Sequence, residues 1–545
     1  MEWLNIAYYT LAGLIAIPTL PTVTFVLIQF RRTYRVPSNL PWAGLKDKWL
    51  FPKTRAGMRE FAAKRDSINE GYEQYAKHGK AFILPTMHWP DVALPPSLNA
   101  WLIAQPDSVL STLKTQDDLL MLEYLGHGPD QAAVHDFSVI TRDLTRQMGR
   151  LLPDLMDELH ASFEESCGSD EVGWREIGLY ETVEKAASRG TNRMFVGLPL
   201  CRNETLMKLM VATGVTFALC GAVLRTLVPS FLKGLLAPII GLPFFIQRWR
   251  MKRVLLPAIK QRMRALQDAA HNEKSLSKTD QPNDGLQWII SSAYRPATNT
   301  FALSPSDIAG KTFLLNFFAV FTTSITAGTV LLEILTHNPT APSAASPADL
   351  IDQLREEAAA ILPQLRKDPT AVRQMHKLDS VIRESLRYNP MVARGIQREV
   401  VQSTGVTTPD GLHLPQGTHV CALIAPMQRD SSLLENADEF QPLRYYNPSP
   451  SAEKPPTAVQ ISLSFLSFSF GKHSCPGRFF AVQTMKVMIG WLLVHYDFEI
   501  IYPEGKTEVE WLEVGEARLP PQGKGKTARV RRRRKGYRDV VVHEE

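Results

Sequence analysis

The chain reads Phe468-Ser-Phe-Gly-Lys-His-Ser-Cys-Pro-Gly-Arg-Phe-Phe-Ala481 near its C-terminal end. Gly471 permits a tight backbone turn before Cys475, and Pro476 can begin a helix immediately after it. A thiolate at the start of a helix is stabilised by the unpaired N–H groups of the first turn. Such a thiolate can serve as a nucleophile or as a ligand to a soft or redox metal. The competing interpretation is a buried, inert cysteine, which is the usual state of a lone cysteine.

This stretch resembles the haem-binding loop of the cytochrome P450 superfamily, which is written F-x-x-G-x-[RH]-x-C-x-G. Its defined positions are filled here by Phe468, Gly471, His473, Cys475 and Gly477. The resemblance implies haem b as the cofactor, with Cys475 as the axial ligand of the iron. It covers nearly the whole chain and implies the cytochrome P450 fold, mainly α with small β-sheets, preceded by one transmembrane helix.

A second motif, Glu384-Ser-Leu-Arg387, places a carboxylate and a guanidinium at i and i+3 on one helical face. Most such pairs are solvated surface charges, so the motif is weak by itself. The family has an E-x-x-R ion pair on the proximal side of the haem, which an arginine from a later segment completes. The resemblance makes Arg444, in Phe440-Gln-Pro-Leu-Arg-Tyr-Tyr446, the candidate for that arginine.

A long helix is predicted from about Pro305 to His337. Ser304 is a good N-cap, proline suits the first helical position, and Asp307 is an acid at the third. The 21 uncharged residues of Thr312–Leu332 are long enough to span a membrane. Several polar side chains within them favour a helix through the middle of a domain instead.

The family's oxygen-activating motif aligns with Phe318-Ala-Val-Phe-Thr-Thr323. The resemblance implies that Thr322 and Thr323 are the catalytic positions, with the Thr322 hydroxyl binding dioxygen and relaying protons to it. Phe321 replaces the usual acid, which leaves the route of proton delivery open. Thr322 has a structural alternative, in which its hydroxyl bonds back to its own helical turn.

The resemblance also suggests which side chains meet the haem propionates and the substrate. Arg142, Arg146 and His473 are the candidates for the propionates, and a solvated helix face is the alternative for the two arginines. The candidate pocket walls are mainly apolar, which predicts a lipophilic substrate. The alternative is that each of these residues simply belongs to the hydrophobic core. These walls are Met121–His127, residues 209–247, Phe317, Phe321, Ile325 and Met391–Ile396.

The N-terminus predicts a membrane anchor. Trp3–Phe30 is 28 residues without a charge, whereas a spanning helix needs about 20. Arginines follow at 31, 32 and 35, which predicts a single-pass protein with its bulk in the cytoplasm. The resemblance implies that the membrane is that of the endoplasmic reticulum. The predicted domains are an anchor at 1–35, a proline-rich hinge at 36–45, a haem-thiolate catalytic domain at 46–521 and a basic tail at 522–545.

Charge and cysteine content exclude other classes of protein. Residues 522–545 contain nine Lys/Arg and three acids, which accounts for the whole net charge of +6. The rest is neutral on balance, so no nucleic-acid partner is predicted. The five cysteines include no C-x-x-C pair, so neither a disulfide framework nor a zinc site is signalled. The run Arg529–Lys535 is either a solvated tail or a contact to anionic lipid.

The body of the chain favours one large, mainly α domain. Helical apolar spacing covers residues 57–79, 135–165 and 175–197. The two uncharged runs at Leu209–Leu224 and Gly234–Gln247 are short for membrane spans and are interpreted as core helices or as an apolar flap beside the bilayer. The predicted strands are Ala81–Pro85, Val92–Leu94, His419–Leu423 and Phe498–Ile501.

The function implied by the resemblance is monooxygenation of a lipophilic small molecule. Thiolate ligation of haem favours O–O bond cleavage. O2 is the co-substrate, and an NADPH-cytochrome P450 reductase is the implied partner because the chain shows no flavin or nicotinamide motif. Asn192–Leu198 and Gln287-Trp288 resemble fungal members that oxidise terpenoids and indole-terpenoids. Two alternatives stay open: a haem-thiolate isomerase or dehydratase, and a non-catalytic haem-binding membrane protein.

Overall fold

A computed structural model describes most of the chain after the N-terminal segment. The described residues are 35–46, 51–62, 65–86, 89–126, 143–271, 281–337, 347–449, 453–514, 516–522 and 527–534. The predicted anchor therefore lies outside them except for Arg35, and so does Arg142.

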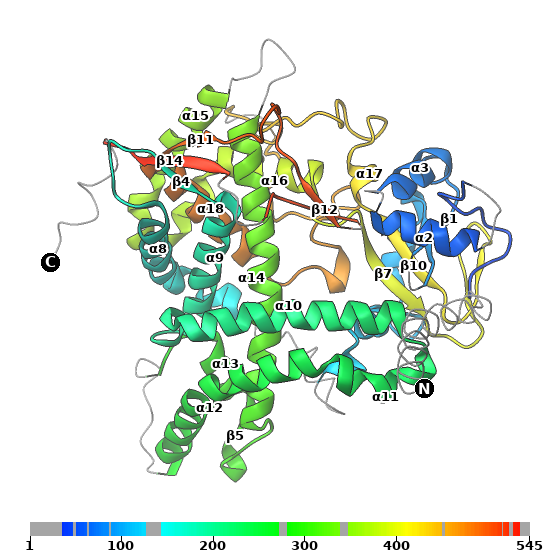
Figure 1. The fold of residues 1–545 in the computed structure, drawn as a ribbon, viewed down its shortest axis with the longest axis horizontal. Helices are drawn as coiled ribbons and strands as arrows, with labels where there is room; N and C mark the ends of the chain where they lie inside the picture. Colours follow the sequence, from blue (N-terminus) through cyan, green and yellow to red (C-terminus); the bar gives the residue numbers. More distant parts are fainter. Residues whose placement is uncertain are drawn as a thin grey trace, which may run out of the picture. The chain divides into compact units, whose positions relative to one another are not determined.

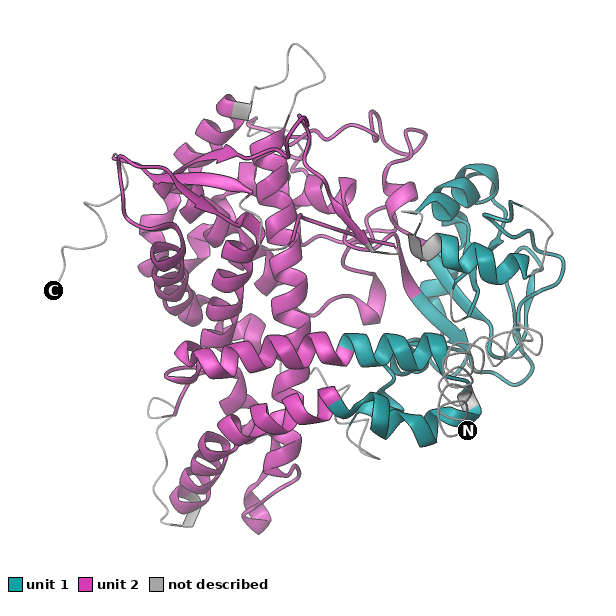
Figure 2. Cartoon of the chain, in the orientation of Figure 1, with its two compact units in different colours: residues 1–126, 218–242, 397–422 teal, residues 127–217, 243–396, 423–545 magenta. Residues whose placement is uncertain are grey.

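The described chain forms two compact units, and the predicted domain boundaries stay a prediction. Unit 1 comprises Met1–Gly126, Ala218–Leu242 and Gln397–Ala422, and unit 2 comprises His127–Phe217, Pro243–Ile396 and Leu423–Glu545 (Figure 2). Each unit draws on segments far apart in the sequence, which is why composition along the chain shows no boundary between them.

Unit 1 is built on the largest sheet, whose strand order is β1-β2-β10-β7-β3. β1 and β2 are antiparallel, and β10 runs parallel to β2 with His419 opposite Asp91. β2 and β10 are buried along their whole length, as expected for a covered sheet, whereas β7 is mostly half-buried. The predicted strands at 81–85, 92–94 and 419–423 are thereby confirmed. The strands are β1 Phe82–Leu84, β2 Asp91–Leu94, β3 Leu110–Ser111, β7 Arg394–Val400, β8 Val406–Thr407, β9 His413–Leu414 and β10 His419–Leu423.

Short helices complete unit 1. The predicted helix at 57–79 is two helices and a 3-10 turn, because Arg65 takes a left-handed conformation before the second helix. The elements are α2 Pro52–Ala62, α3 Asp66–Gln74, η1 Ala76–His78, η2 Pro96–Leu98, α4 Asn99–Ala104, α5 Thr112–Leu120, α6 Leu122–Leu125 and α11 Ser230–Ile240.

Unit 2 is arranged around the predicted long helix, α14 Pro305–Thr336 (Figure 1). It ends one residue before the predicted end. Ser304 and Asp307 form a reciprocal capping box, with both N–H···O distances 3.2 Å, which fixes where the helix begins. α14 contacts α9, α13, α15, α16 and α18, so it is buried on nearly all sides.

The other helices of unit 2 pack around this axis. The predicted helix at 175–197 begins only at Leu179, because residues 175–177 form a strand. The predicted helix at 135–165 is described from Thr145 onward. The helices are α8 Thr145–Cys167, α9 Leu179–Phe195, η4 Leu200–Arg202, α12 Leu242–His271, α13 Gly285–Ala293, η5 Pro296–Thr298, α15 Pro347–Ile361, η6 Leu362–Arg366, η7 Pro369–Gln374, α16 His376–Tyr388, α17 Ala425–Gln428, η8 Gly471–His473 and α18 Arg478–His495.

Part of the basic C-terminal segment is structured. β14 Ala528–Arg532 pairs antiparallel with β11 Tyr496–Ile500 on one side and with β4 Arg175–Ile177 on the other. The solvated-tail alternative is therefore wrong for these residues. β11 also confirms the predicted strand at 498–501 to within two residues. The remaining strands form two-stranded pairs: β5 Tyr294–Arg295 with β6 Thr300–Phe301, and β12 Leu512–Val514 with β13 Ala517–Leu519.

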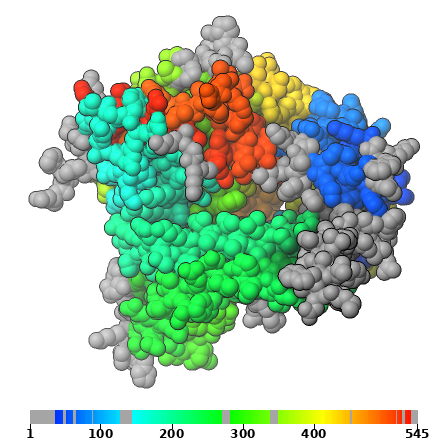
Figure 3. Space-filling model, in the orientation of Figure 1, coloured from blue at the N-terminus to red at the C-terminus, as the bar shows by residue number. Residues whose placement is uncertain are grey.

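Two helices among the described residues are long and apolar enough to cross a membrane: α10 Glu204–Leu227 and α14. The burial of α14 inside unit 2 accounts for its composition. The run at 209–224 lies within α10, whereas the run at 234–247 is divided between α11 and α12, which meet at a bend of 51°. Residues of α10 to α12, green in Figure 3, lie at the surface of the molecule.

Candidate active site

The loop around Cys475 is held in shape by its own backbone. The Cys475 N–H donates to the carbonyl of Phe468 at 2.8 Å, and the Ser474 N–H donates to Gly471 at 3.1 Å. Gly471 has a φ of 70°, a conformation that glycine adopts without strain. α18 begins at Arg478 with Gly477 as its N-cap, two residues later than Pro476 allowed.

The Cys475 sulfur lies beside the first amides of α18. Burial raises the pKa of this thiol above its ordinary value, while the N–H groups of Gly477 and Arg478 and the Arg478 charge act in the opposite direction. Burial raises the pKa of Cys167 to about 12, against the charges of Arg175 and Arg532 and with no backbone donor at its sulfur among the causes. Cys475 thus differs from an inert core cysteine because backbone donors point at its sulfur, an arrangement that suits a thiolate ligand.

Glu384, Arg387 and Arg444 form one buried ion cluster. Arg387 binds Glu384 bidentately, with N···O distances of 2.7 and 2.8 Å, and Arg444 Nε lies 3.2 Å from the same carboxylate. Arg387 also donates to the carbonyls of Gln428 and Glu439 at 2.7 and 2.8 Å. The cluster fastens α16 to the segment that leads toward the cysteine loop.

The middle of α14, from Phe317 to Thr322, is less buried than the stretches on either side of it. Phe321 is 45% exposed and stacks on Phe317 at a centroid distance of 6.0 Å. Phe317 in turn meets Phe217 edge-on at 5.6 Å. This aromatic series forms an apolar face on the helix that carries Thr322 and Thr323, of which Thr323 is buried.

The Thr322 hydroxyl bonds back to its own helix, as the structural alternative predicted. Its Oγ1 donates to the Phe318 carbonyl at 2.7 Å. Thr326 repeats the pattern one turn later and donates to the Thr322 carbonyl at 2.9 Å. A hydroxyl oxygen that donates one hydrogen bond still has two lone pairs to accept others, so this bond leaves Thr322 able to take part in a relay.

The candidates for the propionates are not all described. Arg142 lies outside the described residues, and Arg146 is exposed on α8. His473 is half-buried in η8, next to the cysteine loop. Of the candidate pocket walls, residues 121–126 belong to unit 1, whereas Ile325 and Met391 border one small cleft in unit 2.

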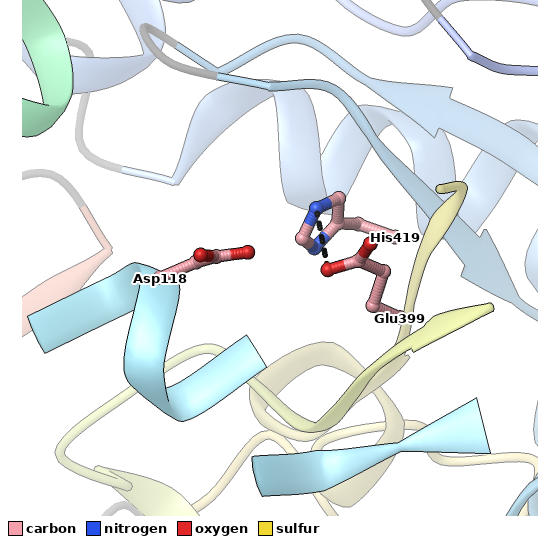
Figure 4. A group of neighbouring side chains, drawn as sticks. All are labelled: Asp118, Glu399 and His419. Carbon is pink, nitrogen blue, oxygen red and sulfur yellow. Dashed lines mark ion pairs between the residues drawn. The ribbon is translucent and has the colours of Figure 1, made fainter. Parts of the chain in front are cut away.

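A second group of titratable side chains, in unit 1, was not found from the sequence. Carboxylate and imidazole atoms of Asp118, Glu399 and His419 lie within 4.8 Å of one another (Figure 4). Burial raises the pKa of Glu399 to about 7, and the negative charge of Asp118 is the second cause of the rise. These three side chains offer one ligand atom each and could hold a cation. The ammonium group of Lys114, however, already pairs with Asp118, with Nζ 2.9 Å from its carboxylate. Glu399 and His419 come from strands β7 and β10 and Asp118 from helix α5, so only the tertiary fold brings them together and no local motif could have identified them.

A mainly helical fold that combines a cysteine just before a buried helix with a buried Glu-Arg-Arg ion cluster is typical of the haem-thiolate class of protein. Residues 149–522 match the family model "Cytochrome P450". The chain therefore belongs to the cytochrome P450 family and is a P450 monooxygenase.

Curated relatives extend over almost the full chain. The cytochrome P450 monooxygenase lnaC of Aspergillus flavus is 30% identical over 89% of this chain and 91% of its own length. The monooxygenase pbrC of Penicillium brasilianum is 30% identical over 96% of each chain. The structure of a cyanobacterial relative, retinoic acid-bound CYP120A1, aligns with a TM-score of 0.59 at 18% identity over 92% of this chain and 99% of that one. This last likeness supports the fold alone.

The residues present fit the haem that the family uses. A single cysteine sulfur with two backbone donors suits the axial position of the iron, and the aromatic face of α14 is an apolar surface of the kind a porphyrin packs against. Cys475 would hold the iron, and Phe468, Gly471 and Gly477 would shape the loop around the ligand.

Proposed function

We propose that this chain inserts one oxygen atom of O2 into a C–H bond of a lipophilic small molecule, a terpenoid or related specialised metabolite. The single observation that supports it most is the amide-held sulfur of Cys475 in a chain of the cytochrome P450 family. The apolar aromatic face on α14 favours a lipophilic substrate. The fungal origin of the relatives named above favours specialised metabolism.

Each residue in this proposal has a distinct task. When bound, the haem supplies the oxygen chemistry, which a thiolate ligand favours. The amides of Gly477 and Arg478 stabilise negative charge on the Cys475 sulfur. Phe317 and Phe321 exclude water from the neighbourhood of Thr322, whose hydroxyl binds O2 and passes protons to it, with Thr323 as the second catalytic position. Arg142, Arg146 and His473 remain the proposed partners of the propionates.

The proposed location is the endoplasmic reticulum membrane, with residues 1–35 as a single-pass anchor and the catalytic part in the cytoplasm. The uncharged run Trp3–Phe30 supports an anchor. In unit 1, Phe231, Leu235 and Ile239 recur every four residues on α11 and are exposed, with Phe231 83% exposed. Side chains at this spacing share one helical face, which supports a second contact with lipid.

The proposed electron donor is a membrane-bound NADPH-cytochrome P450 reductase. The chain shows no flavin or nicotinamide motif of its own, so the electrons for O2 must come from a partner.

A carbon monoxide difference spectrum tests the thiolate ligation. Membranes that contain the reduced full chain should show a strongly red-shifted Soret band, and Cys475→Ala should abolish it. Cys421→Ala is a matched control, because Cys421 is a buried cysteine on β10 far from the cysteine loop in the sequence, and it should keep the band. Haem uptake without that band in the wild type would contradict Cys475 ligation.

A haem-thiolate isomerase or dehydratase is the second candidate. It is favoured by Phe321 at the usual acid position, since such an enzyme needs neither a reductase nor an oxygen relay. The two functions are separated by product formation with and without NADPH and reductase. Product formation that is independent of both would contradict monooxygenation.

A further inference from the structure

The buried carboxyl group of Glu333 lies on the same helix as Thr322, three turns later. Eleven residues separate them, about 16 Å along the axis. Glu333 is 6% exposed. Asn389 Nδ2 donates to its Oε1, whereas Oε2 is buried and has no hydrogen-bond partner among the described residues. Ser385, on the neighbouring helix α16, also interacts with this carboxyl group.

No cation is paired directly with Glu333 among the described residues. Arg518 Nη1 donates to Asn389 Oδ1 at 2.8 Å, and Arg518 Nε lies 3.7 Å from Glu513. Asn389 therefore lies between the two groups, and Arg518 affects Glu333 through its charge without a direct hydrogen bond. Burial raises the pKa of Glu333 to about 8, against the hydrogen bond from Asn389, the nearby Ser385 hydroxyl and the charge of Arg518, and the charge of Glu384 adds to the rise. The group carries a proton at neutral pH.

A small cleft connects the partners of Glu333 with the turn that carries Thr322. Its polar lining consists of Thr326 and Thr329 from α14 and Ser385 and Asn389 from α16. Its volume is about 10 Å³, which is room for about one water. Thr326 lies one turn after Thr322 and donates to the Thr322 carbonyl at 2.9 Å. Thr322, Thr326, Thr329 and Glu333 recur at intervals of three or four residues, so their side chains share one face of α14.

We propose that Glu333 supplies protons to Thr322 through the cleft between α14 and α16, in place of the acid that Phe321 replaces. This inference rests on the proposed monooxygenase function. The Glu333 O–H bond breaks as its proton passes to a cleft water or to Thr329. Each hydroxyl then accepts one proton and releases another, by way of Thr326, until the Thr322 hydroxyl donates.

The transfer involves protons only, and no group is oxidised or reduced. The carboxylate that remains is stabilised by Asn389 and by Arg518 behind it, until a proton from solvent water restores the acid. Glu333 touches neither substrate nor haem in this scheme and acts through Thr326 and Thr322.

Infrared spectroscopy of the purified full chain in detergent tests the first part of the scheme without turnover. A buried protonated carboxyl should give a carbonyl band at pH 7 that shifts in D2O and disappears on titration near pH 8. Glu333→Gln should remove this band. Glu158→Gln is the control, because Glu158 is equally buried but is ionised by Arg189 and Arg202, and it should leave the band unchanged. A wild-type protein without the band at pH 7 would overturn the proposal, even if the variants fail to fold.

Turnover with reductase tests the second part. Glu333→Gln keeps the shape of the side chain but not the acidic proton, so the yield of product per NADPH should fall roughly tenfold with little change in KM. Glu333→Asp retains an acid and should restore coupling at least in part. Equal loss in both variants, or unchanged coupling in Glu333→Gln, would overturn the relay.

Failure of the relay and failure of the proposed function give different results. A wild-type chain that turns over with reductase, beside a fully coupled Glu333→Gln variant, contradicts the relay alone. A wild-type chain that needs no reductase contradicts the proposed function and the relay with it, while the infrared band still decides whether Glu333 holds a proton.

Discussion

Removing the charge of Glu384 should destabilise the protein far more than removing a surface carboxylate. Glu384 is completely buried, and Arg387, which it binds bidentately, is 2% exposed. Glu384→Gln preserves the size of the side chain but leaves the Arg387 guanidinium buried without a counter-charge. Breaking one partner of a buried ion pair costs about 3–5 kcal/mol.

Two features of the cluster bear on where the cost falls in this range. The carboxylate also binds Arg444 at 3.2 Å and accepts the Gln441 N–H at 2.8 Å, so one substitution weakens several contacts. Against this, Arg387 keeps its bonds to main-chain carbonyls, which satisfy part of the guanidinium. We therefore expect the middle of the range, about 4 kcal/mol.

The assay is urea unfolding of the full chain in detergent, followed by far-ultraviolet circular dichroism and extrapolated linearly to water. Glu204→Gln is the matched control, because Glu204 is highly exposed and pairs with Lys208 at 3.0 Å on the surface of α10. Its cost should be about 0.5 kcal/mol or less. If Glu384→Gln also cost less than about 1 kcal/mol, the cluster would not anchor α16 and the reasoning would fail.

Three further predictions concern other parts of the molecule. Thr322→Ala should uncouple NADPH oxidation from product formation, and unchanged coupling would show that Thr322 has no part in the relay. The pKa of Glu399 is raised from 4.5 to about 7, so the folded state loses stability as pH rises between these values. Glu399→Gln should therefore gain stability relative to wild type between pH 4 and 8, by up to about 3 kcal/mol in urea titrations, and a constant difference would contradict the shift. Ser304→Ala should lower the unfolding free energy by about 1 kcal/mol through loss of the capping box on α14, and an effect below about 0.3 kcal/mol would assign no role to this cap.

The features predicted well from the sequence are those whose cause lies within a few residues. The start of α14 depends on Ser304 and Asp307, which are three residues apart and bond to each other. The cysteine loop likewise closes on itself between Phe468 and Cys475. In both cases the residues that determine the local structure are neighbours in the sequence, so the pattern contains the information needed.

The features missed depend on partners that are distant in the sequence. β14 forms because Ala528–Arg532 pairs with β4, more than three hundred residues earlier, and this pairing turns a basic run into a strand. The same strand register explains why 175–177 is not helical. Division into two units has the same origin, since residues 218–242 and 397–422 join unit 1 only in three dimensions.

The role of Glu333 can be inferred from its place in the sequence only once its burial in the fold is known. It directly follows the 21 uncharged residues of Thr312–Leu332. As a sequence feature it resembles an ordinary charge that ends an apolar run. Glu333, however, lies in the buried C-terminal part of α14, and an enclosed acid without a cation retains its proton. The burial of this part of α14 thus raises the pKa of Glu333, and the proposed proton supply to Thr322 depends on that rise.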